Sequence, residues 1–312
     1  MKLNLQQNIR PRVLKPGDTI GVVAPAGPFQ KDLFDAGVDA IHGMGFATKI
    51  DGGIFMRHGF LAGEDRHRAE HFNAMVADDG VQAIMCARGG YGSLRILDRL
   101  DANALFSNPK PLIGFSDITA LHQAIRIKIG LITFHGPMVT TLARSNSATV
   151  HSWYDTLTGS CDLSQALSAS RILKPGAAEG VLTGGNLATL CHMVGTPYGA
   201  DYSGAILLIE DVGEAPYRID RMLTQMKMAG TLEGLNGLIV GEFEDCGPQD
   251  EIDALIVERF RDMDIPIVSG VPIGHGKDNL TVPLGVKVRL DTQGPALRLL
   301  EPVFRVDEGQ GQ

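Results

Sequence analysis

Ser116 lies at a position in the sequence that could carry a catalytic nucleophile. The apolar run 111–114 predicts a short buried strand, and apolar residues at helical spacing follow from Ala120, so Ser116 falls at a turn into a helix. Free N–H groups and the positive end of the helix dipole would stabilise the oxyanion that forms when a serine attacks a carbonyl carbon. A serine before a helix is also a common N-cap. The local pattern therefore leaves a catalytic and a structural interpretation open.

Glu210 and His275 are the candidate partners of this serine. Glu210 follows the unbroken apolar run 205–209, and His275 stands between two glycines. A Ser–His–carboxylate site needs a base within reach of the hydroxyl and an acid that orients the base, and both can be remote in sequence. The order serine, acid, histidine is that of the α/β-hydrolases, but their G-x-S-x-G motif is absent because Ile118 occupies the last glycine position. Each partner also has a plain interpretation, as a solvated carboxylate at a strand end and as a loop histidine.

The elements that must position these residues alternate in the first half of the chain. Apolar runs at 19–25, 83–87 and 111–114 predict strands, and the stretches 34–44 and 64–75 have a helical pattern. Such alternation is typical of a mostly parallel sheet with helices on both faces, whose site lies beyond the carboxyl ends of the strands. The glycines at 89–92 and Ser116 follow two of these strands, so we expect them to open onto one crevice.

The second half predicts a separate domain. Short apolar strands at 205–209, 237–240, 266–268, 286–290 and 296–300 indicate mixed α/β or barrel character. The pattern weakens between about residues 144 and 176, where serines gather before Lys174-Pro175-Gly176. We therefore expect domains at 1–160 and 176–312, joined by a linker at 161–175.

Composition and charge exclude several classes of function. The 312 residues carry a net charge of -8 without a basic cluster interleaved with aromatics, which argues against nucleic acid as a partner. No apolar run approaches the roughly 20 residues of a membrane-spanning helix, and no signal-peptide core follows Met1, so we expect a cytoplasmic protein. The four cysteines are far apart and no H-E-x-x-H set occurs. The sequence thus predicts free thiols, no metal and no cofactor.

Six motifs in the same order resemble the LD-carboxypeptidase family, which contains the muramoyltetrapeptide carboxypeptidases and the microcin C immunity peptidases. They are GVVAPAGP (21–28), ARGGYG (87–92), GFSDIT (114–119), GGNL (184–187), LIEDVGE (208–214) and GHG (274–276). The resemblance runs from about residue 14 to residue 303. It implies an α/β fold with an N-terminal Rossmann-like parallel-sheet domain that carries the serine. A C-terminal domain with a small β-barrel would carry the glutamate and the histidine, and the protein would usually be a homodimer.

The resemblance also implies catalytic roles. Ser116 resembles the nucleophile, His275 the general base and Glu210 the acid that orients the imidazole. Asp211 and Glu214 share the motif with Glu210, but the first residue after the strand matches the family position best, and neighbours on a strand point to opposite sides.

Further residues of the motifs would bind the reacting groups. The backbone N–H groups of Gly90 and Asp117 are the expected oxyanion donors. Arg88 and Tyr91 are candidates for holding the substrate, and Asn186 for shaping the floor of the cleft. Each of these three also has an ordinary structural interpretation.

The implied reaction is hydrolysis of an amide between an L-configured centre and a terminal D-amino acid, as in the release of D-alanine from a murein tetrapeptide. It would pass through an acyl-enzyme. One alternative is a microcin C immunity-type peptidase that cleaves a peptidyl or aminoacyl adenylate analogue, although Trp153, the single tryptophan, lies outside the motifs. The alternative from another class is a catalytically inactive two-domain peptide-binding protein.

Overall fold

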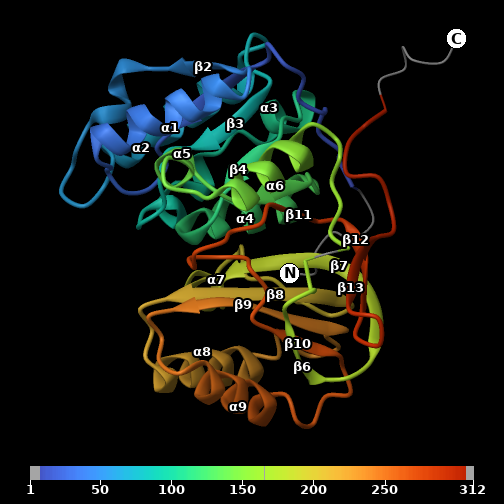
Figure 1. Ribbon diagram of the computed structural model, residues 1–312. Helices are drawn as coiled ribbons and strands as arrows, with labels where there is room; N and C mark the ends of the chain where they lie inside the picture. Colours follow the sequence, from blue (N-terminus) through green and yellow to red (C-terminus); the bar gives the residue numbers. More distant parts are fainter. Residues whose placement is uncertain (1–7, 165, 307–312) are drawn as a thin grey trace, which may run out of the picture.

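A computed structural model of the protein describes residues 8–164 and 166–306. Two β-sheets, one above the other in Figure 1, organise this part of the chain. The strand order is β11-β5-β4-β3-β1-β2 in the first sheet and β13-β12-β7-β8-β9-β10-β6 in the second. The predicted two-domain α/β fold is confirmed, with the small barrel of the C-terminal domain present as a curled half-barrel sheet.

The first sheet has helices on both faces. Its strands are β1 (Thr19–Val23), β2 (Ala47–Ile50), β3 (Ala83–Cys86), β4 (Leu112–Gly114), β5 (Thr133–His135) and β11 (Val282–Leu284). Its helices are α1 (Lys31–Gly43), α2 (Asp65–Ala77), α3 (Ala102–Ser107), α4 (Thr119–Ile129), α5 (Val139–Leu142) and α6 (Ser147–Leu157). Short 3-10 turns are η1 (Gly52–Phe55), η2 (Ser93–Arg99) and η3 (Ser116–Ile118).

The first sheet creates a crevice at the strand ends. All neighbouring strands are parallel apart from β11, and β2 and β3 lie on opposite sides of β1. Loops that leave β1 and β3 therefore diverge, which opens the sheet edge to a ligand. The turns that follow β3 and β4 carry the glycines at 89–92 and Ser116.

The second sheet is parallel in its centre and antiparallel at its edges. Its strands are β6 (Arg171–Lys174), β7 (Ala177–Asn186), β8 (Ala205–Val212), β9 (Gly237–Glu244), β10 (Ile267–Ser269), β12 (Lys287–Asp291) and β13 (Ala296–Leu299). Its helices are α7 (Leu187–Met193), α8 (Pro216–Met228) and α9 (Gln249–Arg259). Figure 1 shows α8 and α9 on the face of this sheet that is turned away from the first domain.

The two faces of β8 have different neighbours. Leu207 and Ile209 belong to the apolar cluster beneath α8 and α9, whereas Ile206 and Leu208 belong to a cluster that also contains first-domain side chains. Side chains alternate along a strand. Glu210 therefore continues the face that is turned toward the first domain.

The two domains are joined by a shared β-strand pairing and by a common apolar core. β11 comes from the second half of the chain but pairs antiparallel with β5 of the first sheet, with Val282 opposite His135. The apolar cluster that contains Ile113 of β4 also contains Leu208 of β8 and Val282 of β11. The halves are thus joined by a strand and by continuous apolar packing.

Several predicted boundaries are wrong. β8 and β9 do not stop at Ile209 and Val240 but continue through polar residues, because both strands lie inside the sheet and their ladder does not depend on side-chain polarity. The helix α6 forms in the polar stretch after residue 144, because Trp153 and Leu157, one turn apart, are fully buried.

The expected linker also contains structure. β6 lies within 161–175 and pairs antiparallel with β10 of the second sheet. The division into domains at 1–160 and 176–312 with a linker at 161–175 stays a proposal. β6 lies inside that linker but belongs to the second sheet, and β11 lies in the second half of the chain but belongs to the first sheet. No helix within the described ranges is long and apolar enough to cross a membrane.

Candidate active site

Ser116 has a backbone conformation that side chains rarely adopt. Its φ angle is 64°, in the left-handed region, which costs a residue other than glycine about 1–2 kcal/mol. Phe115 is still extended, η3 begins at Ser116, and α4 follows directly. A strained serine on a strand-to-helix turn is typical of exposed nucleophiles. The expected helix start is therefore a short 3-10 turn, in which Ser116 is partly exposed between buried neighbours.

The glycine loop after β3 lies against this serine. A Cβ on Gly89 would come within 2.9 Å of Ser116 Cβ and 3.0 Å of its Oγ, so a side chain at this position would displace the hydroxyl. Gly89 also accepts a hydrogen bond from the N–H of Gly27, which fixes the loop to the turn after β1. The loop thus brings its backbone to the serine, as an oxyanion donor at Gly90 requires.

The carboxylate of Asp117 holds the two turns together, a role that the sequence did not reveal. It accepts a hydrogen bond from the backbone N–H of Ser93 at 2.7 Å. Burial raises the pKa of Asp117. The buried guanidinium of Arg68 donates to the carbonyl oxygens of Pro25 and Gly92. These contacts link the loops after β1, β3 and β4.

Glu210 and His275 form a preassembled pair. His275 Nδ1 lies 2.6 Å from Glu210 Oε2, and the glutamate side chain is fully buried. This contact occupies Nδ1, which leaves Nε2 as the ring nitrogen that can act as a base. A Cβ on Gly274 would lie 2.7 Å from Glu210 Oε2, so the absence of a side chain there lets the loop rest on the carboxylate.

The protonation of this pair follows from its surroundings. Burial alone would raise the pKa of Glu210, but the imidazoles of His135 and His275 more than offset it and hold this pKa at about 2. Burial alone would lower the pKa of His275, and the carboxylate of Glu210 outweighs that effect and raises it above the ordinary value. Glu210 is thus ionised at neutral pH and strengthens the imidazole as a base.

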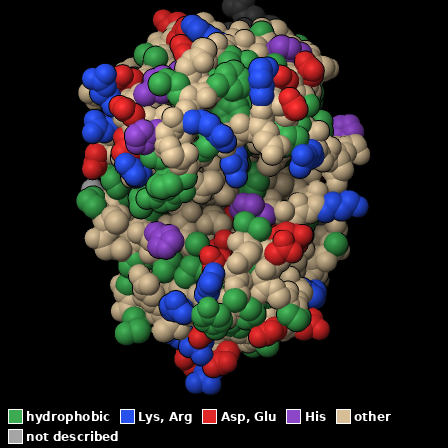
Figure 2. Space-filling view, turned by 90° about the vertical axis from the view of Figure 1, so that its left-hand side faces the viewer, with side chains coloured by type: hydrophobic (Ala, Val, Ile, Leu, Met, Phe, Trp, Pro, Cys, Tyr) green, Lys and Arg blue, Asp and Glu red, His purple; other side chains and the backbone are tan. Residues whose placement is uncertain are grey.

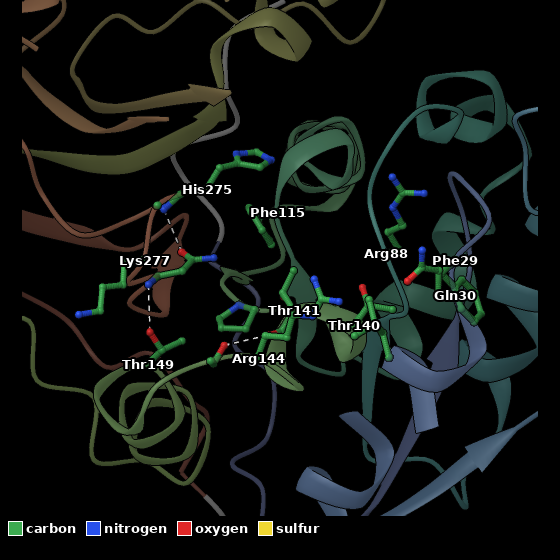
Figure 3. Close-up of a pocket in the computed structure, with 16 residues that line it drawn as sticks. Phe29, Gln30, Arg88, Phe115, Thr140, Thr141, Arg144, Thr149, His275 and Lys277 are labelled. Atoms are coloured by element: carbon green, nitrogen blue, oxygen red, sulfur yellow. Dashed lines mark hydrogen bonds between the residues drawn. The ribbon is translucent and has the colours of Figure 1, made fainter. Parts of the chain in front are cut away.

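Phe115 brings the serine turn and the histidine loop together. Its ring centroid lies 4.7 Å from that of His275, and Ser116 is the next residue in the chain. The loop is further fixed by Asn279, whose Oδ1 accepts from the N–H of Gly274 and whose own N–H donates to Thr149 of α6 (Figure 3). The two halves of the candidate site therefore meet at one junction between the domains.

The other two acids of the motif lie elsewhere. Asp211 points to the opposite face of β8, where it accepts hydrogen bonds from the N–H of Ala188 and from Asn186 Nδ2. Burial and the charge of Glu210 raise the pKa of Asp211 to about 6. Glu214 forms an ion pair with Arg218 at the start of α8. Neither is placed to orient His275.

A cavity of about 640 Å³ opens beside the His275 loop. Figure 3 shows His275 and Lys277 on one side of it, Arg88 and Gln30 on the other, and Arg144 between them. The lining comprises Phe29, Gln30, Leu33, Arg88, Phe115, Pro137, Thr140, Thr141, Arg144, Ser145, Thr149, Gly274, His275, Gly276, Lys277 and Asn279. Figure 2 shows a hollow between the two halves of the molecule, with Lys and Arg side chains above it.

The cavity lining contains cations but no Asp or Glu. Arg88, Arg144 and Lys277 line it, and all three side chains are exposed. Ser116 is not among the lining residues, although Phe115 next to it is. The sequence pointed to Arg88 but not to Arg144, because a single arginine in a polar stretch carries no signal of its own.

The remaining candidates have clear structural contacts. Asn186 caps α7 through the N–H of Thr189, and its amide nitrogen binds Asp211. Tyr91 is exposed and lies against Phe60. Neither lines the cavity. Within the described part of the chain, no group of three or more His, Cys, Asp or Glu side chains is placed to hold a metal ion.

A strained serine from one domain beside a Glu–His pair from the other is the arrangement expected of a serine hydrolase. Comparison with known proteins is more specific. The family models for the N-terminal and the C-terminal domain of LD-carboxypeptidases match residues 20–136 and 179–290. The chain therefore belongs to the LD-carboxypeptidase family of serine carboxypeptidases.

Individual relatives match over nearly the whole chain. The probable murein peptide carboxypeptidase of Bacillus subtilis is 38% identical and covers 94% of this chain and 94% of its own length. The microcin C7 self-immunity protein MccF of Escherichia coli is 29% identical, with 92% and 96% covered. The crystal structure of muramoyltetrapeptide carboxypeptidase from Oxalobacter formigenes has a TM-score of 0.80 at 30% identity and covers 90% of this chain and 97% of that one.

Proposed function

We propose that this protein hydrolyses the amide bond between an L-configured centre and a terminal D-amino acid, and that it releases D-alanine from murein tetrapeptides. The observation that carries the proposal is the buried Glu210–His275 pair, which Phe115 places next to the strained turn of Ser116. Family membership and the name of the Bacillus subtilis relative support the substrate class.

In the proposed reaction, Ser116 Oγ attacks the carbonyl carbon of the amide while His275 Nε2 takes the hydroxyl proton. The N–H groups of Gly90 and Asp117 donate to the oxyanion of the tetrahedral intermediate. The C–N bond then breaks, and His275 gives the proton to the leaving amine of the D-amino acid. Water hydrolyses the acyl-enzyme by the same proton transfers, and no step requires a metal ion.

The cations of the cavity support an anionic substrate. A murein tetrapeptide carries a terminal carboxylate and further carboxylates on D-glutamate and diaminopimelate. Guanidinium groups bind carboxylates through charge-assisted, often bidentate hydrogen bonds. We propose that Arg88, Arg144 and Lys277 bind carboxylates of the substrate, and that Tyr91 and Asn186 act at most on the shape of the surrounding loops.

Two alternatives fit the structure less well. A microcin C immunity-type peptidase has the support of the MccF relative, but Trp153 is fully buried in the first domain and is not available to stack on a nucleobase. A catalytically inactive peptide-binding protein would have no need for backbone strain at Ser116 or for a buried Glu–His pair.

Incubation with L-Ala-D-Glu-meso-diaminopimelyl-D-Ala tests the proposal, with free D-alanine as the product measured. We expect release by the wild-type protein, and none from the same peptide ending in L-alanine. Ser116→Ala should lower kcat by several powers of ten because the nucleophile is lost. A parallel incubation with processed microcin C separates the two peptidase activities. Turnover of microcin C alone, or an active Ser116→Ala variant, would contradict the proposal.

We also propose that the protein works in the cytoplasm as a homodimer, as its family resemblance implies. Light scattering at several protein concentrations tests the assembly, and a monomeric mass throughout would refute the homodimer.

A further inference from the structure

The carboxylate of Glu210 has a second imidazole beside it. His275 engages Oε2, whereas Oε1 is buried and has no hydrogen-bond partner among the described residues. Nε2 of His135 lies 3.7 Å from Oε1, and the side chains of both residues are fully buried. Glu210 is thus flanked by one histidine from each domain.

His135 belongs to the sheet that carries the serine. It is the last residue of β5, and Gly114 of β4, two residues before Ser116, is its neighbour in the parallel ladder. Both ring nitrogens of His135 are buried, and neither has a hydrogen-bond partner within the described ranges. His122 of α4 lies nearby, but its Nε2 is occupied by the carbonyl oxygen of Gly114.

We propose that His135 is a positioning residue for the hydrolysis, whose Nε2–H donates to Glu210 Oε1 and so presents Oε2 to His275. The inference rests on the proposed function. A movement of less than about 1 Å brings the pair from 3.7 Å into hydrogen-bond range. Catalytic hydrogen bonds are often long before substrate binds and tighten in the complex with substrate.

The chemistry of the position supports this role over simple packing. Buried polar atoms are almost always hydrogen-bonded, and an apolar side chain would fill a core position without two unsatisfied nitrogens. Among the residues that the structure describes, the titratable groups placed against His135 are Glu210 on β8 and His122 on α4, and His275 shares the carboxylate of Glu210. Glu210 is the one acid among them, and its free oxygen is the acceptor that His135 lacks.

Variants of His135 separate positioning from packing. His135→Leu removes the donor, and we expect kcat to fall about 10- to 100-fold with KM changed by less than about twofold, as for other partners that orient an active-site ligand. His135→Gln can place an amide N–H near the position of Nε2 and should recover most of the loss. His71→Leu on α2 is the matched control, because it also removes a buried, unpartnered ring nitrogen but lies outside the candidate site.

A double mutant tests whether His135 acts through Glu210. In a Glu210→Gln background, His135→Leu should cost less than about threefold in kcat, because the carboxylate that it positions is already replaced by a neutral amide that no longer supports His275. If His135→Leu still lowers kcat 10- to 100-fold in the Glu210→Gln background, the proposal is overturned. Wild-type kcat in His135→Leu would do the same.

A proton resonance gives a readout that needs no substrate. The Nδ1–H proton of His275, shared with Glu210 at 2.6 Å, should appear far downfield in the NMR spectrum of the wild-type protein. We expect it to shift or broaden in His135→Leu and to be kept in His135→Gln and His71→Leu. An unchanged resonance in His135→Leu would overturn the positioning role of His135, even if no murein peptide is cleaved. Failure of this proposal is therefore distinguishable from failure of the proposed function. If His135→Leu does not fold, His135→Asn takes its place, because its shorter amide does not reach Glu210. The same resonance is then compared between His135→Asn and His135→Gln.

Discussion

At the scale of single residues, the position of the partly exposed Ser116 on its turn depends on backbone strain. The left-handed conformation places a side chain at the outside of the strand-to-helix turn, which glycine would form more easily. The reactive position therefore lowers the stability of the folded state.

Replacing this serine should separate strain from catalysis. Ser116→Gly removes the penalty of a Cβ in the left-handed region, whereas Ser116→Ala keeps it. We expect both variants to be inactive and the glycine variant to have a free energy of unfolding about 1 kcal/mol higher than that of the alanine variant. Urea unfolding measures the difference, and equal stabilities would show that the turn is not strained.

The Glu210–His275 pair should control the pH dependence. kcat/KM requires the neutral imidazole, so it rises with pH through the pKa of His275 in the free enzyme. Glu210 raises this pKa, which puts the midpoint above the ordinary value of about 6.5. A midpoint well below it would contradict the assignment.

Glu210→Gln tests the contribution of the carboxylate to the same pair. Loss of the charge should move the midpoint to lower pH and reduce kcat by about 10²- to 10⁴-fold, because the imidazole is no longer oriented or stabilised as a cation. Glu214→Gln is the control from the same motif, and we expect it to be nearly wild type in both quantities. An equal loss at Glu214 would transfer the role of the acid to that residue.

At the scale of elements, the short link between α5 and α6 brings Arg144 to the cavity. Arg144→Gln should raise KM for the tetrapeptide about tenfold, with a smaller effect on kcat, because it removes a charged contact to the substrate away from the reacting atoms. Arg261→Gln, at an exposed position after α9, is the control. A wild-type KM in Arg144→Gln would remove Arg144 from the binding residues.

The sequence predicted the elements that have a clear period or a distinctive turn. The strand before Ser116 was predicted from its turn. The opposite directions of the Glu210 and Asp211 side chains were predicted from the alternation of side chains along a strand. The sequence did not reveal β5 and β11, because these strands, as short as β4, do not lead into a long helix of clear period and gain their stability from sheet neighbours that are distant in sequence. His135 was missed for the same reason, since its place beside Glu210 depends on pairing between distant segments.

At the scale of the whole molecule, continuous packing between the sheets should make unfolding cooperative. Trp153, the single tryptophan, reports on the first domain, and far-UV circular dichroism reports on both. Because one apolar cluster contains side chains of both sheets, we expect the two signals to change with the same midpoint in urea. Two separated transitions would show that the domains are independent.

The pairing of β11 with β5 also affects the order in which the protein can be completed during synthesis. Chain growth proceeds from the N-terminus, and the central strands of the second sheet precede residues 282–284. Until these residues leave the ribosome, the edge of β5 has no partner, and an open strand edge is a template for pairing with other chains. His135 lies on that strand, directly opposite Val282. The last strand to join the first sheet therefore both closes an open strand edge and covers the strand that carries His135, so a nascent chain that stops before it would have neither.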